Sequence, residues 1–291
     1  MKKMMSMKLM WAVACAFLLI GSAASAQIKM PAASPTATVK QPVGLTDVTL
    51  EYSRPSTKGR KIFGDLVPYG RLWRTGANAS TKLTFSDEVT LEGNKVPAGQ
   101  YALYTVPGEN EWTIVIHKNT KHWGDGGAAY KQEEDLVRFK VPAQKLADKA
   151  ETFTIGFSDL TNNSGVMNIM WENTLVPVKI TTDVDTKVMA QIQEKVINGT
   201  NVTPALYASA ANYYADNGKD LKQAITWFKL ANEKDPKFWN LHYQAKAQAR
   251  AKDYKGATAT AQKSLELAKK ENNADYVALN EKLLAEIKGK K

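Results

Sequence analysis

The chain has 291 residues, which is enough for two domains of ordinary size, and a formal net charge of +10 at pH 7. Its one cysteine, Cys15, lies near the N-terminus, so an internal disulfide is excluded. If the first residues are removed on export, the remaining chain also lacks a thiolate nucleophile and any cysteine-based metal site.

Residues 1–26 have the pattern of a secretory signal peptide. Three lysines precede an apolar run from Leu9 to Ile20, and small residues typical of a cleavage site end at Ala26. The apolar run is too short to span a bilayer. We therefore expect a periplasmic protein without a transmembrane segment in the mature chain, with outer-membrane association or secretion as alternatives. A lipid anchor at Cys15 is disfavoured because this residue lies inside the apolar run.

The region that follows predicts an antiparallel β-sandwich. Residues 27–45 are rich in Ala, Pro, Thr and Ser and are expected to form a flexible lead-in. Between residues 46 and 183, short segments of alternating apolar and polar residues are separated by turn residues, the pattern of a sandwich or barrel. Single helical turns are expected near 127–134 and 143–149. The expected strands lie at 48–52, 82–86, 88–91, 100–106, 112–118, 136–141, 153–157, 167–171 and 175–181.

Residues 184–291 predict an α-helical domain, because the composition shifts to Ala, Lys, Gln and Leu. One amphipathic helix is expected at 186–197 and a last, capping helix at 275–287. Thr203 and Pro204 have the residue types of a helix N-cap and a first helical position.

Two units of this helical region match at a spacing of 33 residues, which indicates tetratricopeptide-like repeats. The second unit lacks the closing proline, and the first has one extra residue around 218–220. Two repeats are fewer than such arrays need, so flanking helices or the sandwich should cover the remaining apolar face. The matched positions are Ala224, Phe228, Ala231 and Pro236 in the first unit, and Ala257, Ala261, Ser264 and Lys269 in the second.

The long loop, residues 52–80, has no strand or helix periodicity and combines glycines and prolines with arginines and aromatic residues. Its apolar residues favour burial, so we expect an ordered element and not a disordered one. Residues 51–77 hold six basic and two acidic residues, whereas residues 27–183 as a whole hold 18 basic and 17 acidic ones. This concentration of positive charge fits an anionic partner. Nucleic acid is excluded for an exported protein, which leaves acidic glycans, lipid headgroups or acidic peptides.

Two interpretations of the long loop remain open. In the first, its guanidinium groups bind carboxylate, sulfate or phosphate oxygens, and Tyr69 and Trp73 stack on a sugar. In the second, the loop plugs one end of the sandwich and its arginines pair with the protein's own oxygens, as buried polar groups must. The candidate ligand-binding residues are Arg54, Arg60, Tyr69, Arg71, Trp73, Arg74, Asn78, Trp123 and Glu172.

A metal or catalytic site has weaker support. His117, His122 and Asp125 offer ligand types that suit zinc, but their spacing is no known signature, and surface histidines with an Asx turn are the default. The acidic run at 133–135 is interpreted as a solvated face. The sequence contains no Gly-x-Ser-x-Gly elbow, phosphate-binding Gly-Lys-Thr loop or His-Glu-x-x-His helix. No cofactor is expected, and enzymatic activity stays undecided.

A series of short motifs runs through the β region. They are Tyr52-Ser53-Arg54-Pro55, Gly59-Arg60, Ile62-Phe63-Gly64, Pro68-Tyr69-Gly70, Trp73-Arg74-Thr75-Gly76-Ala77-Asn78, Pro97-Ala98-Gly99-Gln100-Tyr101, Trp123-Gly124 and Trp171-Glu172. Through these motifs, residues 45–182 resemble the exported bacterial family called domain of unknown function 2911. The resemblance implies an exported domain that is often followed by helical repeats of this kind, and it implies no activity or catalytic residues.

These observations favour an exported binding or assembly protein. The long loop would bind an anionic or glycan ligand, and the helical repeats would bind a protein or peptide. Residues 184–291 hold 18 basic and 12 acidic residues, which favours an acidic partner. The alternative is an envelope hydrolase, with or without a metal, that uses Asp125, His122 or Glu172 at the mouth of the long loop.

Overall fold

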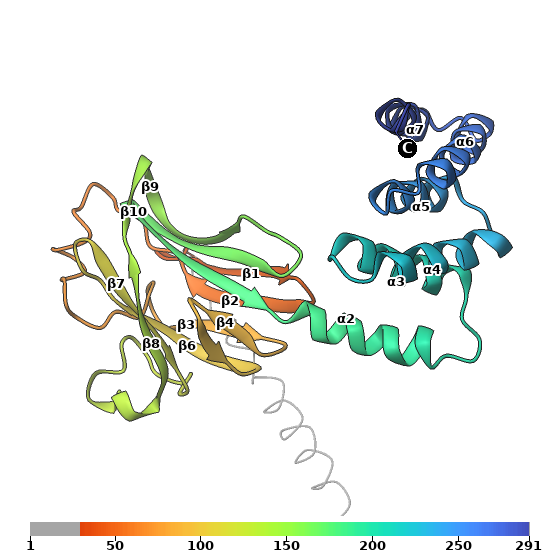
Figure 1. Ribbon diagram of the computed structural model, residues 1–291. Coiled ribbons are helices and arrows are strands. Elements are labelled where there is room, and N and C mark those ends of the chain that lie inside the picture. The colour runs from red at the N-terminus through yellow and green to blue at the C-terminus, as the bar shows by residue number, and fades with distance from the viewer. Residues whose placement is uncertain (1–29, 291) are drawn as a thin grey trace, which may run out of the picture. The chain divides into compact units, whose positions relative to one another are not determined.

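The computed structural model describes residues 30–290, so the predicted signal peptide lies outside the described residues. The chain forms two compact units. Among the described residues, one unit comprises residues 30–42 with Thr46–Leu160 and Gly165–Ile180, and the other comprises Val43–Leu45, Thr161–Ser164 and residues 181–290. Antiparallel sheets come first and helices follow, as the sequence predicts (Figure 1).

The β unit consists of two sheets, and neither closes into a barrel. The six-stranded sheet has the order β1 (Thr36–Val43), β2 (Thr46–Ser53), β3 (Thr81–Phe85), β6 (Gly99–Val106), β7 (Glu111–His117) and β8 (Asp135–Pro142). The four-stranded sheet has the order β5 (Asn94–Val96), β4 (Val89–Leu91), β10 (Ser164–Thr182) and β9 (Gln144–Ser158).

An aromatic cluster fills the core of the β unit. Phe63 and Trp73 of the long loop meet residues from strands that lie far along the chain. The ring of Phe63 lies 4.8 Å from that of Trp112 in an edge-to-face contact, and Trp73 stacks on Trp171 with centroids 5.9 Å apart. The remaining members of the cluster are Tyr52 and Phe153. The long loop therefore supplies part of the hydrophobic core.

Strands β6 and β7 are buried on both faces. Leu103 and Ile116 are fully buried, and so are their outward-pointing neighbours Tyr104 and Val115. Residues 119–134 cover this outer face and include the turns η1 (Gly127–Ala129) and η2 (Gln132–Glu134), which confirms the helical turns expected there.

Three expectations for the β unit are wrong. The lead-in expected at 27–45 contains β1, an edge strand whose alternate residues are exposed, so it carries little apolar signal. The helical turn expected at 143–149 is the solvent-exposed start of β9, where pairing with β10 overrides a helix-like composition. The two strands expected at 167–171 and 175–181 form one continuous strand, β10.

The helical unit begins with α2 (Val184–Ile192), which continues into one π-helical turn, η3 (Gln193–Ile197). Thr203 caps α3 by accepting a hydrogen bond from the Leu206 amide, and Pro204 is the first helical residue, as predicted. Within residues 30–290, no helix has the length and apolarity needed to cross a membrane. The other helices are α3 (Pro204–Asp216), α4 (Leu221–Lys234), α5 (Phe238–Arg250), α6 (Tyr254–Lys270) and α7 (Ala274–Ile287).

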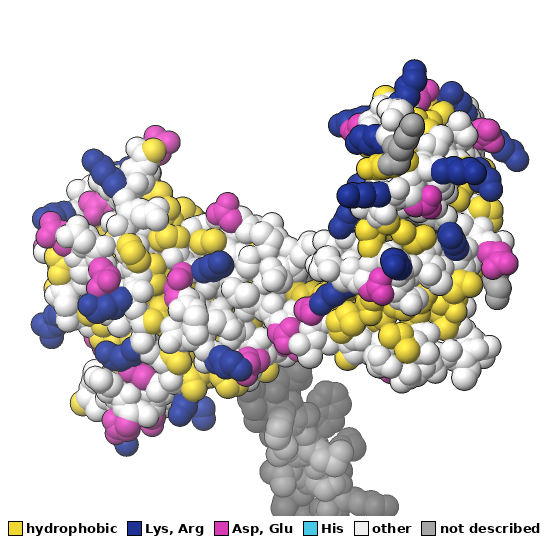
Figure 2. All heavy atoms as spheres, viewed as in Figure 1, with side chains coloured by type: hydrophobic (Ala, Val, Ile, Leu, Met, Phe, Trp, Pro, Cys, Tyr) yellow, Lys and Arg dark blue, Asp and Glu magenta, His cyan; other side chains and the backbone are white. Residues whose placement is uncertain are grey.

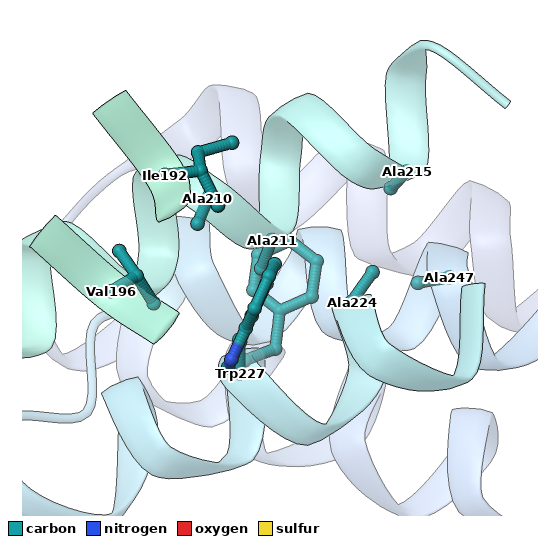
Figure 3. Packing of buried hydrophobic residues seen from close by; sticks show 9 residues of the cluster. Ile192, Val196, Ala210, Ala211, Ala215, Ala224, Trp227 and Ala247 are labelled. Atoms are coloured by element: carbon teal, nitrogen blue, oxygen red, sulfur yellow. The ribbon is translucent and has the colours of Figure 1, made fainter. Parts of the chain in front are cut away.

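The matched repeat positions lie where helices pack closely. Figure 3 shows small alanine side chains, among them Ala211 of α3 and Ala224 of α4, around the indole of Trp227. Side chains without bulk let neighbouring helices approach, which explains why alanine recurs at these positions. The buried repeat residues are Ala224, Phe228 and Ala231 of α4 and Ala257, Ala261 and Ser264 of α6.

Ser264 replaces an alanine of the first unit because it belongs to a buried polar network. The Asn280 amide donates to Ser264 Oγ over 2.7 Å and to the Tyr276 carbonyl, and its Oδ1 lies 2.9 Å from His242 Nδ1. Ser264 Oγ in turn donates to the Phe238 carbonyl over 2.6 Å. The network ties α5, α6 and α7 together, and burial lowers the pKa of His242 below its usual 6.5.

Removing the centre of this network should destabilise the helical unit. We expect Asn280→Ala to lower the free energy of unfolding by about 2–3 kcal/mol, because buried groups lose their partners. Urea unfolding followed by far-ultraviolet circular dichroism measures the change, with the exposed Gln262→Ala of α6 as the control. A loss no larger than that of the control would contradict the assignment.

Candidate functional site

The start of the long loop adds to the exposed edge of β9. The Thr57 amide donates to the Glu151 carbonyl and the Phe153 amide donates to the Pro55 carbonyl, both over 2.8 Å. The Glu151 carboxylate accepts from the Thr57 hydroxyl and, over 2.8 Å, from the Lys58 amide. These bonds fix the loop to the four-stranded sheet.

The middle of the long loop is held by its aromatic residues and by Glu172. Trp73 exchanges main-chain hydrogen bonds with Thr105 and has only 8% of its surface exposed, so it is a core residue and not a platform for a sugar. Glu172 Oε2 accepts from the Ile62 amide over 3.2 Å. Glu172 therefore stabilises the main chain of the loop.

Two of the four loop arginines pair with the protein itself. Arg54 Nε donates to the Phe153 carbonyl over 3.1 Å, and its Nη2 donates to Thr154 Oγ1 over 2.8 Å. Arg60 donates to the carbonyls of Thr57 and Ser56 over 2.9 and 2.8 Å. These two arginines behave as the plug interpretation predicts.

The other two arginines, Arg71 and Arg74, make no hydrogen bond or ion pair with the part of the chain that the structure describes. Arg71 is exposed and Arg74 is half-buried. Nε of Arg74 is sealed from solvent and meets no acceptor. An uncompensated buried donor costs about 1–3 kcal/mol, so Arg74 is the least satisfied cation of the loop.

Arg71 and Arg74 line a cleft of about 500 Å³, which we call the arginine cleft. Of the candidate ligand-binding residues, Arg60 and Trp73 line it as well, whereas Arg54, Tyr69, Asn78, Trp123 and Glu172 do not. Asp125 is the one carboxylate among the described lining residues. The complete lining is Ser34, Pro55, Arg60, Leu66, Val67, Pro68, Arg71, Leu72, Trp73, Arg74, Gly76, Ala77, Asp125 and Trp171.

Asp125 reaches the arginine cleft because its loop is tied to the long loop. The Gly124 amide donates to the Asn78 carbonyl over 3.0 Å, and Trp123 forms a bridge with Ala79. Asn78 has a φ of +61° and its amide donates to Ser53 Oγ, so its role is to shape the turn. Asp125 itself accepts from the Gly127 amide in the expected Asx turn.

Tyr69 lies outside the arginine cleft. It is 44% exposed and its ring covers Gly64, where a Cβ atom would come within 2.8 Å of it. Partial burial and then the carboxylates of Glu109 and Glu172 raise the pKa of Tyr69. Its hydroxyl therefore stays protonated at neutral pH.

The histidines form a structural cluster instead of a zinc site. Within residues 30–290, no group of three or more His, Cys, Asp and Glu side chains is arranged to hold a metal ion. His117 is fully buried, and its Nδ1 lies 2.9 Å from Asp135 Oδ1. His122 Nδ1 lies 3.2 Å from the Tyr104 hydroxyl, and Asp125 faces the arginine cleft.

The acidic run at 133–135 was interpreted from the sequence as a solvated face. For Asp135 this is wrong, because its side chain is only 6% exposed. It accepts hydrogen bonds from Tyr130 over 2.7 and 2.9 Å and also pairs with Arg138. Burial and the bond to Asp135 raise the pKa of Tyr130 to about 12. The cluster holds residues 119–134 against the outer face of β6 and β7.

The hydrolase alternative would use Asp125, His122 or Glu172 at the mouth of the long loop. Of these, Asp125 lines the arginine cleft, whereas His122 contacts Tyr104 and Glu172 contacts Ile62. A general acid and base must lie within hydrogen-bond reach of one substrate. Asp125 is therefore the one of these three groups that faces the cleft.

The fold and the site define a two-sheet antiparallel β domain that carries an arginine-lined cleft and is followed by helices. The chain belongs to the family described as "Protein of unknown function (DUF2911)", whose model matches residues 34–180. The match includes all of β1, which lies before the residues 45–182 that carry the resemblance in the sequence. No curated protein and no solved structure matches the chain.

Glu151 should make the anchoring of the long loop pH-dependent. Hydrogen bonds from the Thr57 hydroxyl and the Lys58 amide hold the pKa of this carboxyl below its usual 4.5. A carboxylate whose pKa is lower in the folded chain stabilises the fold above the unfolded pKa, and this contribution is lost as pH falls through the folded pKa. We expect Glu151→Gln to give a small decrease in Tm at neutral pH, and the difference from wild type to shrink below pH 4.5.

Thermal unfolding across this pH range measures the effect. Glu109→Gln is the matched control, because Glu109 is exposed and makes no hydrogen bond among the described residues. A Tm difference that stays constant from neutral to acidic pH would contradict the role of the Glu151 charge.

Proposed function

We propose that this protein is an exported binding or assembly protein, whose arginine cleft binds an anionic ligand and whose helical unit binds a protein. The observation that carries the proposal is that Arg71 and Arg74 line one cleft without a partner among the described residues. A carboxylate, sulfate or phosphate group supplies the oxygen acceptors that guanidinium groups pair with best.

The preorganisation of the cleft supports ligand binding. The segment that carries Arg71 and Arg74 is fixed by Trp73, which is buried and exchanges main-chain hydrogen bonds with Thr105. Cations that are positioned before the ligand arrives lose little conformational entropy on binding. The positive charge of the long loop also favours the approach of an anion.

The backbone beside Arg74 is strained, which also supports a functional role. Thr75 is fully buried at a φ of +54°, a conformation that β-branched residues rarely adopt. Thr81 Oγ1 donates to the Thr75 carbonyl over 2.6 Å, and the Thr75 hydroxyl lies 3.1 Å from Thr105 Oγ1. Strain of this kind persists where the surroundings impose it, often at ligand sites.

The helical unit supplies the surface for a protein partner. The 33-residue spacing and the buried alanines support tetratricopeptide-like repeats, which bind peptide segments. The charged residues that line a groove of about 600 Å³ between α4, α5 and α6 are three lysines and two glutamates, Lys229, Lys263, Lys270, Glu233 and Glu266, and none of the lysines is ion-paired among the described residues. Lys and Arg side chains are spread over the visible face of this unit (Figure 2), which favours an acidic segment.

The proposed location is the periplasm. The signal-peptide pattern of residues 1–26 supports export, and envelope components then become the relevant anions. The long loop and the helices together would let the protein connect such a component to a protein partner.

Binding by the arginine cleft is tested with Arg71→Ala and Arg74→Ala, using galacturonate, sulfate and phosphate as probes in isothermal titration calorimetry. We expect affinity for the preferred anion to fall about tenfold or more in each variant, the loss of one charge-assisted contact. The Tm should not fall, because neither side chain has a partner in the described part of the chain.

Lys61→Ala is the matched control, since Lys61 is an exposed cation of the same loop that does not line the cleft. A decrease in Tm with unchanged affinity would assign Arg71 and Arg74 to the structural plug and refute the proposed function.

A further inference from the structure

We infer that the indole of Trp123 forms a second binding position beside the arginine cleft, so that the ligand is an acidic oligosaccharide and not an isolated anion. This inference rests on the proposed function, in which the cleft binds an anion. It adds a sugar ring that lies outside the cleft and the residue that holds it.

Trp123 is 75% exposed, and its side chain contacts no other ring in the part of the chain that the structure describes. Tryptophan is the side chain with the largest apolar surface, and it usually buries most of it. Trp73, Trp112 and Trp171 of the same unit are each less than 9% exposed. Trp123 therefore differs from the tryptophans of the core and has a free face for a ligand.

The main chain around Trp123 is held firmly. Trp123 bridges to Ala79, and its carbonyl accepts from the Gly126 amide over 3.2 Å. Gly124 has a φ of +65°, and a Cβ atom there would lie 3.1 Å from Arg74 Nη1. The turn that carries Trp123 is thus packed directly against the arginine of the cleft.

Trp123 is also close in the sequence to a residue that lines the arginine cleft. Asp125 lines that cleft and is two residues further along the chain, a span of at most about 7 Å between Cα atoms. This length is of the order of one sugar residue. A ring stacked on Trp123 and a neighbouring acidic ring in the cleft can therefore belong to one chain.

The groups at the two positions complement an acidic sugar chain. The carboxylate of one sugar pairs with Arg71 and Arg74, and the hydroxyls of the same sugar donate to the Asp125 carboxylate. The C–H face of the next sugar covers the indole of Trp123. A free phosphate would leave Trp123 unused. An anionic membrane surface would require protruding cations, whereas the arginines lie in a cleft of about 500 Å³.

The experiment compares galacturonate with its linear trimer by isothermal titration calorimetry on the full chain and on Trp123→Ala, Trp123→Phe and Arg74→Ala. We expect the wild type to bind the trimer about tenfold more tightly than the monomer, the gain typical of an aromatic anchor. Trp123→Ala should remove this gain and leave monomer affinity unchanged. Trp123→Phe should keep most of the gain, because a flat ring remains.

Trp239→Ala, which removes a 38% exposed tryptophan of α5, is the control and should leave both affinities unchanged. Equal binding of the trimer by wild type and Trp123→Ala would overturn the inference while leaving the anion site intact. Unchanged binding of the monomer by Arg74→Ala would overturn the proposed function itself. Binding to phosphatidylglycerol vesicles that depends on Trp123, without binding of either sugar, would also overturn the inference and assign the surface to a membrane.

Discussion

The insertion of Phe63 and Trp73 between the two sheets is the interaction on which the β domain depends. Their rings contact Trp112, Phe153 and Trp171 at centroid distances of 4.8 to 6.1 Å, so a segment without regular structure is held as firmly as a strand. Because Trp73 points into the core, the backbone on either side of it is fixed. The flanking Leu72 and Arg74 are thereby brought to the arginine cleft.

The long loop uses its arginines for two different purposes. Arg54 and Arg60 saturate oxygens of the loop and of β9, so their charges are committed to the fold. Arg71 and Arg74 leave their donors unmatched by the described residues, and for the buried Nε of Arg74 this carries an energetic cost. The plug interpretation therefore applies to Arg54 and Arg60, whereas ligand binding by Arg71 and Arg74 stays a proposal.

The alternation of Val48 and Leu50 and the Thr203–Pro204 helix start were predictable from the sequence, because local patterns determine them. The β1 strand was not, since an exposed edge strand has little apolar periodicity. The structural role of Arg54 was also hidden, because its partners, the Phe153 carbonyl and the Thr154 hydroxyl, lie about a hundred residues further along the chain. Asp125 is held at the cleft by the hydrogen bond from the Gly124 amide to the Asn78 carbonyl. In the sequence, the Trp123-Gly124 motif was the one feature that pointed to this contact.

The central claim is that the Arg74 guanidinium lines the arginine cleft and can donate hydrogen bonds to a ligand, because it has no acceptor among the described residues. Its side-chain Nε–H resonance, assigned by comparison with Arg74→Lys, tests this claim most directly in a ¹H–¹⁵N spectrum recorded while galacturonate is added. The account predicts that this resonance shifts progressively as galacturonate is added, while the Nε–H resonances of Arg54 and Arg60 stay in place. An Arg74 resonance that does not move at saturating ligand would contradict it.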